Sequence, residues 1–334
     1  MGRDMRAVAL FSGGLDSSLA IKVMVEQGIE VAALNFTSPF CRCQRQGGCS
    51  ASINNRAKDL GVTFKSMYLG EEYLEIVRNP KHGYGRNLNP CIDCRILKLK
   101  KAKVFMQEIG ASFLFTGEVL GQRPMSQHRQ ALKVIEKESG LEGLVLRPLS
   151  AKLLEPTMPE KKGWVKREAM LEISGRTRKP QIELAEQLGV KGYSCPAGGC
   201  LLTDSGFSKR VEDVFKHAEF SLNNVELLKI GRHFRINPDF KLIVGRNEQE
   251  NNRLSQYRNN EDLYFEPKDL PGPSALGRGK ADMQTKQISS QIISRYISSN
   301  QKVEIIVSTG SQETTEILLA EAIEENKLRE LMIN

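Results

Sequence analysis

The stretch LFSGGLDSS at residues 10–18 decides how this chain folds. It continues the apolar run 7–11, which predicts a β-strand, and leads into the helically spaced run 16–27, which Gly28 is suited to end. Glycines let the backbone approach a phosphate, and the free amides of a helix start point toward it. No Lys-Ser/Thr pair follows the glycines, so this is not a Walker loop. The stretch therefore predicts a phosphate-binding loop of another kind.

Strands and helices continue to alternate as far as about residue 150. Further strands are predicted at 31–36, 64–69, 113–116 and 145–148, and intervening helices at 51–60 and 91–109. This order predicts an α/β domain with a parallel, Rossmann-like sheet, whose ligands bind at the carboxyl ends of the strands. A helical pattern is predicted for 161–188.

The rest of the chain predicts a second, smaller domain. Beyond about residue 205 the pattern becomes mixed α+β, with a strand at 303–307 and a closing helix at 313–331. A chain of 334 residues exceeds what one hydrophobic core usually fills. We therefore predict domains at 1–205 and 206–334.

Composition narrows the class of protein. A net charge of +8 and a pI near 9.1 favour a polyanionic partner such as nucleic acid. The apolar runs are too short to cross a bilayer, and the first residues leave no room for a signal peptide before the first strand. We expect a cytoplasmic protein with no membrane partner, in which the seven cysteines act as ligands or reactive thiols.

The phosphate loop resembles the SGGxDS loop of the PP-loop ATPases, the adenine nucleotide alpha-hydrolase superfamily. The resemblance implies that ATP is cleaved between its α and β phosphates and that AMP is transferred to a substrate oxygen. Asp16 is suited to hold Mg²⁺. Phe36 and the Thr116-Gly117 turn are expected at the edges of the nucleotide pocket. The complete set of expected nucleotide ligands is Ser12, Gly13, Gly14, Asp16, Ser17, Ser18, Phe36, Thr116 and Gly117.

The cysteines indicate which reaction the loop serves. Cys91 and Cys94 lie on one face of a first helical turn, where the helix dipole and Arg95 favour thiolates. Together with Cys200, they resemble the tRNA thiolation enzymes, the 2-thiouridylases and 4-thiouridine synthetases. In cluster-bearing members, this resemblance makes Cys91, Cys94 and Cys200 the ligands of a 4Fe–4S cluster whose fourth iron binds sulfide. In members without a cluster, Cys94 and Cys200 are the nucleophile and persulfide pair. Cys195 is an alternative to Cys200.

A separate group of cysteines follows the second predicted strand. Cys41, Cys43 and Cys49 are candidates for a second metal site, a redox site or part of the sulfur path, and free thiols are the simplest alternative. The sequence does not decide between these.

Residues 218–285 resemble the RNA-binding domain of NFACT proteins, through Leu242–Asn247 and Asp269–Pro273. We therefore predict an ATP-dependent tRNA sulfurtransferase with Asp16, Cys94 and Cys200 as catalytic residues. Its partners are tRNA and sulfide or a cysteine-desulfurase-type donor, and a homodimer is left open. Arg147-Pro148-Leu149 and the PFCRC segment at 39–43 resemble the 4-thiouridine synthetases more than the anticodon 2-thiouridylases, which favours 4-thiouridine. The alternatives are a persulfide-based 2-thiouridylase, a PP-loop ligase, and an RNA-binding protein without thiolation activity.

Overall fold

A computed structural model describes residues 5–42, 49–193, 199–299, 301–309 and 315–334. The chain divides into two compact units, Met1–Thr203 and Asp204–Asn334. The boundary predicted between residues 205 and 206 falls at the first residue of α8 (Ser205–His217). Over the described residues, every helix is too short or too polar to span a membrane.

The first unit is built on a five-stranded parallel sheet with strand order β3-β2-β1-β4-β5. This agrees with the predicted parallel α/β fold. The strands are β1 (Arg6–Leu10), β2 (Glu30–Thr37), β3 (Thr63–Tyr68), β4 (Phe113–Thr116) and β5 (Val145–Leu146). The helices are α1 (Leu15–Val25), α2 (Cys49–Asp59), α3 (Glu71–Arg78), α4 (Cys91–Glu108), α5 (Arg129–Ser139), α6 (Met158–Lys161) and α7 (Lys179–Gln187).

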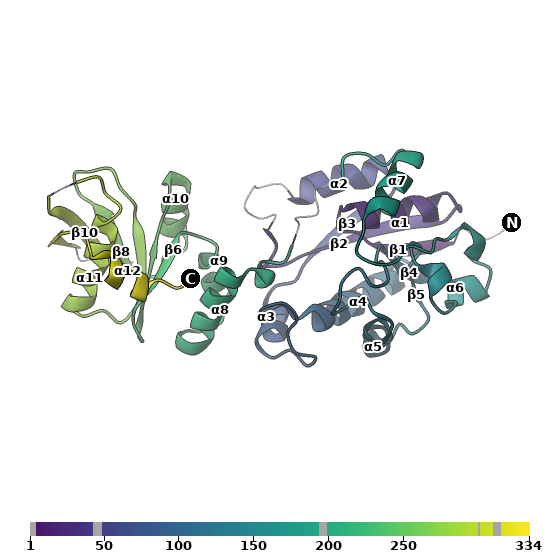
Figure 1. The fold of residues 1–334 in the computed structure, drawn as a ribbon, viewed down its shortest axis with the longest axis horizontal. Helices are drawn as coiled ribbons and strands as arrows, with labels where there is room; N and C mark the ends of the chain where they lie inside the picture. Colours follow the sequence, from purple (N-terminus) through teal and green to yellow (C-terminus); the bar gives the residue numbers. More distant parts are fainter. Residues whose placement is uncertain (1–4, 43–48, 194–198, 300, 310–314) are drawn as a thin grey trace. The chain divides into compact units, whose positions relative to one another are not determined.

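Helices cover both faces of this sheet, which is why its central strand β1 is apolar from residue 7 to residue 10. Ala7 and Ala9 of β1 pack into the core formed with α1, α2 and α7, whereas Val8 packs into the core formed with α4 and α5. This alternation follows from the two-residue period of a strand. The two helical layers are visible on opposite sides of the sheet (Figure 1).

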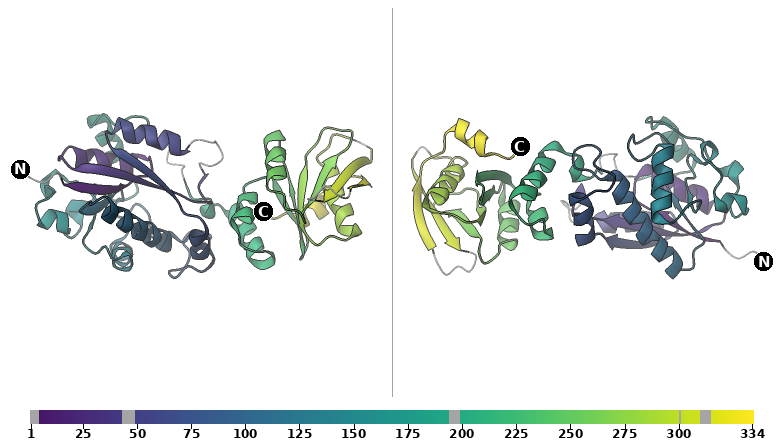
Figure 2. Two further views of the ribbon diagram at one scale, coloured as in Figure 1. Left: turned by 180° about the vertical axis from the view of Figure 1, so that it is seen from behind. Right: turned by 90° about the horizontal axis from the view of Figure 1, so that it is seen from below.

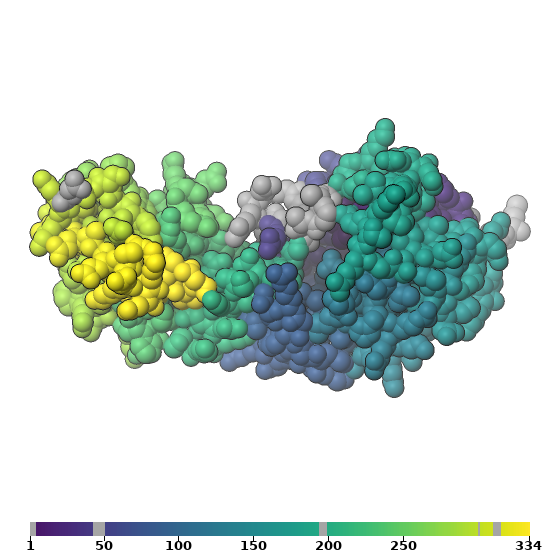
Figure 3. Space-filling view, in the orientation of Figure 1, coloured from purple at the N-terminus to yellow at the C-terminus, as the bar shows by residue number. Residues whose placement is uncertain are grey.

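The carboxyl ends of the central strands meet at one edge. Leu10 at the end of β1 pairs with Leu34 of β2 and with Thr116 at the end of β4. The loops after β1, β2 and β4 therefore start side by side. In the space-filling view, the first unit is hollowed in this region, and purple atoms from the start of the chain lie at the bottom of the hollow (Figure 3).

The second unit contains a six-stranded antiparallel sheet with strand order β11-β10-β8-β9-β7-β6. The strands are β6 (Arg232–Asn237), β7 (Phe240–Val244), β8 (Leu263–Pro267), β9 (Ala275–Gly279), β10 (Val303–Thr309) and β11 (Thr315–Ala320). Its remaining helices are α9 (Leu222–Leu227), α10 (Glu248–Gln256), α11 (Met283–Ser294) and α12 (Glu325–Leu331).

Two apolar clusters stabilise this sheet from opposite faces. Leu242 and Val244 of β7 pack with Ile292 of α11. Ile243, between them, packs with Leu227 of α9 and with α10. The helices therefore lie on both sides of the sheet, as two further views show (Figure 2).

Two helix predictions are wrong in part. Residues 315–320, predicted to begin the closing helix, form β11, because their backbone pairs with β10 from Val303↔Ala320 to Ser308↔Thr315. Tertiary pairing here overrides the helical pattern. The helix predicted for 161–188 is confined mainly to α7, since Gly163 and Gly175 adopt φ values of 65° and 85° that a helix excludes.

Replacing Gly277 with alanine tests the packing of the second unit. A Cβ atom there would lie 2.3 Å from Cζ of Phe240 and 3.0 Å from Cε2 of Phe265, two fully buried rings. We expect the free energy of unfolding to fall by about 1–3 kcal/mol in urea denaturation of the full chain. Gly206→Ala is the matched control, because the nearest atom is 3.6 Å away, and we expect no loss of stability there. Equal stability of the two variants would contradict this packing.

Candidate functional site

The predicted phosphate loop connects β1 to α1 through a left-handed glycine. Gly13 has a φ of 71°, and Gly14 caps α1 without a side chain. The hydroxyls of Ser17 and Ser18 each donate to the carbonyl of Gly14 at 3.0 Å, and the hydroxyls of Ser12 and Ser17 are 3.2 Å apart. The helix start thus presents backbone amides and serine hydroxyls at one point, an arrangement that suits a phosphate.

The Asp16 carboxylate, in the first turn of α1, has one oxygen without a partner. Oδ2 accepts a hydrogen bond from Nε2 of Gln122 at 3.1 Å, whereas Oδ1 is buried and has no hydrogen-bond partner. A buried carboxylate oxygen is costly to leave unpaired. This oxygen therefore fits a Mg²⁺ ion, which prefers oxygen ligands and bridges phosphates.

Arg56 of α2 fixes the other side of the loop. Its guanidinium donates to the carbonyls of Gly13 and Gly192. A Cβ atom on Gly13 would lie 2.9 Å from Cγ1 of Ile53. The same helix therefore holds the phosphate loop and the segment that leads to Cys200.

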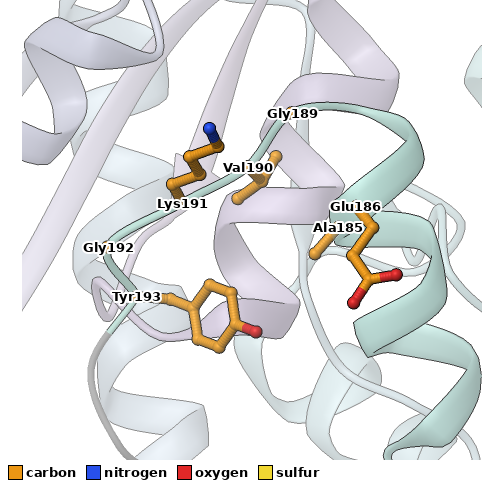
Figure 4. Close-up of a pocket in the computed structure, with 7 residues that line it drawn as sticks. All are labelled: Ala185, Glu186, Gly189, Val190, Lys191, Gly192 and Tyr193. Atoms are coloured by element: carbon orange, nitrogen blue, oxygen red, sulfur yellow. The ribbon is translucent and has the colours of Figure 1, made fainter.

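A cavity of about 310 Å³ lies beside this segment. It is lined by Ala185, Glu186 and residues 189–193, and the Tyr193 ring points into the space beside α7 (Figure 4). No predicted nucleotide ligand lines it. Its relation to the phosphate loop is indirect, through the Arg56–Gly192 hydrogen bond.

Gly117 makes a close backbone contact with the phosphate loop. A Cβ atom at this position would lie 2.5 Å from the backbone carbon and oxygen of Asp16 and from the backbone nitrogen of Ser17. Because those are backbone atoms, no rotamer change relieves the overlap. The Thr116-Gly117 turn after β4 therefore packs directly on the start of α1, and glycine is required by space rather than by an unusual φ.

Buried ion pairs connect this turn to the cysteine helix. Glu118 forms an ion pair with Arg95 of α4 and a second one, at 3.0 Å, with Arg147. Arg147 also contacts Glu136 at 2.5 Å. Burial lowers the pKa of Arg95 to about 10, and the neighbouring Arg123 adds to the effect. Because breaking a buried pair leaves an uncompensated charge, this network fixes α4 relative to the turn.

Phe36, near the end of β2, is half-buried and packs against the core that contains α4. The adjacent Asn35 side chain donates to the Phe11 carbonyl at 2.8 Å. This bond ties the end of β2 to the residue that precedes the phosphate loop. Phe36 thus lies at the same sheet edge as Thr116.

Helix α4 begins at Cys91, so Cys91 and Cys94 occupy its first turn. Between them, the buried Asp93 carboxylate accepts the backbone N–H of His82 at 3.0 Å and hydrogen-bonds its Nδ1 at 2.9 Å. The other ring nitrogen of His82 is 3.0 Å from Glu138 of α5. These contacts hold the start of α4 in place.

Cys41, Cys94 and Cys200 form one group, here called the thiol cluster. Cys41 and Cys200 lie opposite each other in an isolated antiparallel bridge, and Cys94 and Cys41 are electrostatic neighbours of Cys200. Tyr73 of α3 hydrogen-bonds with Cys94. Burial raises the pKa of Cys200 to about 12, so this thiol is protonated at neutral pH. Nearby Cys94 raises the pKa of Lys98, which also lies near Cys41 and Cys200.

Cys91 lies at the margin of the thiol cluster. Burial raises its pKa, and its charged neighbours are Arg95, Arg123 and Lys98, with Cys94 beside them. In the part of the chain that the structure describes, no group of three or more His, Cys, Asp or Glu side chains is placed to hold a metal ion. Cys94 is thus an electrostatic neighbour of both Cys91 and Cys200.

Three other cysteines cannot be placed in this site. Cys43, Cys195 and the side chain of Cys49 lie outside the described residues. The second metal site at Cys41, Cys43 and Cys49, and the use of Cys195 in place of Cys200, stay predictions.

Several residues of the site were not predicted. Gln122, Glu118, Arg56, Tyr73 and Lys98 each contact a predicted residue through a hydrogen bond, ion pair or charge. Only Lys98 carried a signal in the sequence, because it follows Cys94 by four residues on a predicted helix. The others depend on contacts between distant segments.

Two family models match the chain. Residues 2–152 match the model described as Thiamine biosynthesis protein (ThiI), and residues 231–332 match the NFACT protein RNA binding domain. The chain therefore carries a ThiI-like PP-loop domain followed by an NFACT-type RNA-binding domain.

Curated relatives and solved structures are more distant. The tRNA-specific 2-thiouridylase MnmA of Nitrobacter hamburgensis is 28% identical over 141 residues, which cover 39% of this chain and 35% of that protein. The chain thus spans about a third of the length of this relative. A 4-thiouridine synthetase–RNA complex with bound ATP is 21% identical, with a TM-score of 0.37 and coverage of 69% of this chain and 53% of that one. The U34-tRNA thiolase NcsA of Methanococcus maripaludis with its [4Fe-4S] cluster is 17% identical, with a TM-score of 0.33 and coverage of 68% and 74%.

Gly117→Ala tests the contact between the turn and the phosphate loop. The added methyl group overlaps the backbone of Asp16 and Ser17, and overpacking of this kind costs about 1–3 kcal/mol. We expect ATP binding, measured by calorimetry, to weaken about tenfold or more. Gly206→Ala, in α8, is the control and should bind ATP normally. Unchanged ATP affinity in a folded Gly117→Ala protein would contradict the assignment.

Proposed function

We propose that this protein is an ATP-dependent tRNA sulfurtransferase, which adenylates a uridine carbonyl oxygen and replaces that oxygen with sulfur. One observation carries the proposal. The Gly117 turn touches the backbone of Asp16 on one side, and on the other its neighbour Glu118 pairs with Arg95, the residue next to Cys94. A phosphate loop and a pair of thiols thus share one rigid support, as adenylation followed by sulfur transfer requires.

The phosphate loop supplies the first step. The amides at the start of α1 and the hydroxyls around Gly14 suit the phosphates of ATP. Magnesium bound by Asp16 would neutralise phosphate charge. The uridine carbonyl oxygen attacks the α phosphorus, pyrophosphate leaves, and the base becomes a better electrophile. The positive end of α1 stabilises the charge that builds up on the phosphates.

The thiols supply the second step. A 4Fe–4S cluster on Cys91, Cys94 and Cys200 requires these three cysteines to converge. Among the described residues, Cys200 has Cys94 and Cys41 as thiol neighbours, and Cys91 has Cys94 beside the cationic side chains of Arg95, Arg123 and Lys98. The cluster on these three cysteines stays a prediction. Sulfur is carried on Cys94 and Cys200, and the outer sulfur of the Cys200 persulfide displaces AMP from the base. Thiols then supply the two electrons that release this sulfur from Cys200 as thiouridine, and an external dithiol restores them.

The charge distribution supports tRNA as the substrate. In residues 1–203, Lys and Arg clearly outnumber Asp and Glu, whereas in residues 204–334 acidic residues slightly exceed basic ones. The PP-loop unit therefore contributes the general attraction for RNA phosphates. The NFACT-type domain adds contacts that depend less on net charge. Because Arg147-Pro148-Leu149 resembles the 4-thiouridine synthetases, we favour 4-thiouridine as the product.

Two variants separate the two steps. We expect Asp16→Asn to abolish both AMP formation and thiolation, because it removes the oxygen suited to magnesium. We expect Cys94→Ala to lower thiolation at least about a hundredfold while AMP formation and tRNA binding persist. AMP is measured by chromatography and thiouridine by mass spectrometry of digested tRNA. Full thiolation by Cys94→Ala would overturn the proposal.

Cys91→Ser distinguishes the thiol pair from a cluster. Because Cys91 lies at the margin of the thiol cluster, we expect this variant to retain most of its thiolation activity. Iron, labile sulfide and the visible spectrum are measured on anaerobically prepared protein. About four irons and four sulfides in the wild type, lost together with activity in Cys91→Ser, would instead establish the iron–sulfur mechanism.

A further inference from the structure

Cys41 lies directly opposite the sulfur-carrying Cys200. The two form an antiparallel bridge, and the backbone N–H of Leu201 donates to the carbonyl of Phe40 at 2.8 Å. That hydrogen bond flanks the two cysteines instead of joining them. The bridge is therefore a non-hydrogen-bonded pair, the kind that brings Cα atoms to about 4.5 Å and side chains closest together. Disulfides form at Cα separations of about 4.4–6.8 Å.

The residues on either side of the bridge keep this register fixed. Phe40 is fully buried and packs against Tyr73 in a tilted arrangement, with ring centroids 5.7 Å apart. Leu201 and Leu202 are buried as well. The two cysteines themselves are only partly buried. The backbone on both sides of the bridge is thus anchored.

Hydrogen bonds position the Cys41 thiol. The backbone N–H of Ser38 donates to Sγ of Cys41 at 3.2 Å, and the Ser38 hydroxyl is 3.5 Å from the same atom. The Lys98 ammonium interacts with Cys41 as well. In contrast, Cys94 is hydrogen-bonded to Tyr73.

We propose that Cys41, rather than Cys94, is the thiol that resolves Cys200 after sulfur transfer; this rests on the proposed function, in which Cys94 and Cys200 carry the sulfur. The outer sulfur of a Cys200 persulfide forms a bond to the adenylated carbon, and the carbon–oxygen bond to AMP breaks. The base is then attached to Cys200 through a disulfide. The Cys41 thiolate attacks Sγ of Cys200, which forms the Cys41–Cys200 disulfide and expels the sulfur on the base as thiouridine. Cys41 and Cys200 together lose two electrons, which reduce the former outer sulfur of the persulfide to the level of thiouridine. An external dithiol then reduces the Cys41–Cys200 disulfide to two thiols.

A single-turnover experiment on the full-length protein tests this step. Protein loaded with glutathione persulfide is mixed anaerobically with Mg–ATP and an unmodified tRNA transcript, without added reductant. The reaction is quenched with iodoacetamide, and tryptic peptides are mapped by mass spectrometry. Trypsin cleaves after Arg42, so a link at Cys41 is distinguished from one at Cys43. Fragmentation separates Cys195 from Cys200, and Cys195→Ser is the matched control.

We expect wild-type protein to stop after one thiouridine per chain with Cys41 linked to Cys200. We expect Cys41→Ser to release at least tenfold less thiouridine, to retain tRNA attached to Cys200, and to be rescued by dithiothreitol. Rescue by a small thiol would not follow from a structural defect. A Cys94–Cys200 link, or full release by Cys41→Ser without reductant, would overturn the proposal while leaving thiolation intact. Absence of thiouridine from the wild type would overturn the proposed function and this inference with it.

Discussion

The site depends on a backbone contact that only glycine allows. Gly117 lies so close to Asp16 and Ser17 that even a methyl group would overlap their backbone atoms. This contact joins the turn after β4 to the loop after β1, two neighbouring parallel strands whose last residues are in register. A pre-organised site requires such rigid supports, because misplacement of reacting groups by about 1 Å costs up to about a hundredfold in rate.

Buried ion pairs connect the Gly117 turn to the helix that carries the thiols. Glu118, one residue beyond Gly117, is buried between Arg95 and Arg147. Such pairs add little net stability when complete, but losing one partner costs about 3–5 kcal/mol. The network therefore specifies position: it fixes the first turn of α4 at the edge of the sheet where the phosphate loop opens. Because Arg95 follows Cys94 directly in the sequence, the network also fixes the position of Cys94.

Local features of the sequence predicted most of the fold and part of the site. Strands β1, β2 and β4 were predictable because their apolar residues pack on both faces of the sheet, and the phosphate loop because Gly13 needs a left-handed φ. The prediction of a closing helix was wrong over β11, where pairing with β10 determines the backbone conformation. The association of Cys41 with Cys200 had no local signal, since it depends on a bridge between segments far apart in the chain. The same holds for Gln122 and its bond to Asp16.

The central claim is that adenylation at the phosphate loop serves sulfur transfer to tRNA. The most direct measurement incubates the full-length protein anaerobically with Mg–ATP, a persulfide donor and an unmodified tRNA transcript, and quantifies AMP, pyrophosphate and thiouridine together. We predict that AMP and pyrophosphate form in equal amounts, only when tRNA is present, and in step with thiouridine. Pyrophosphate release without tRNA, or RNA binding with no pyrophosphate at all, would contradict the account.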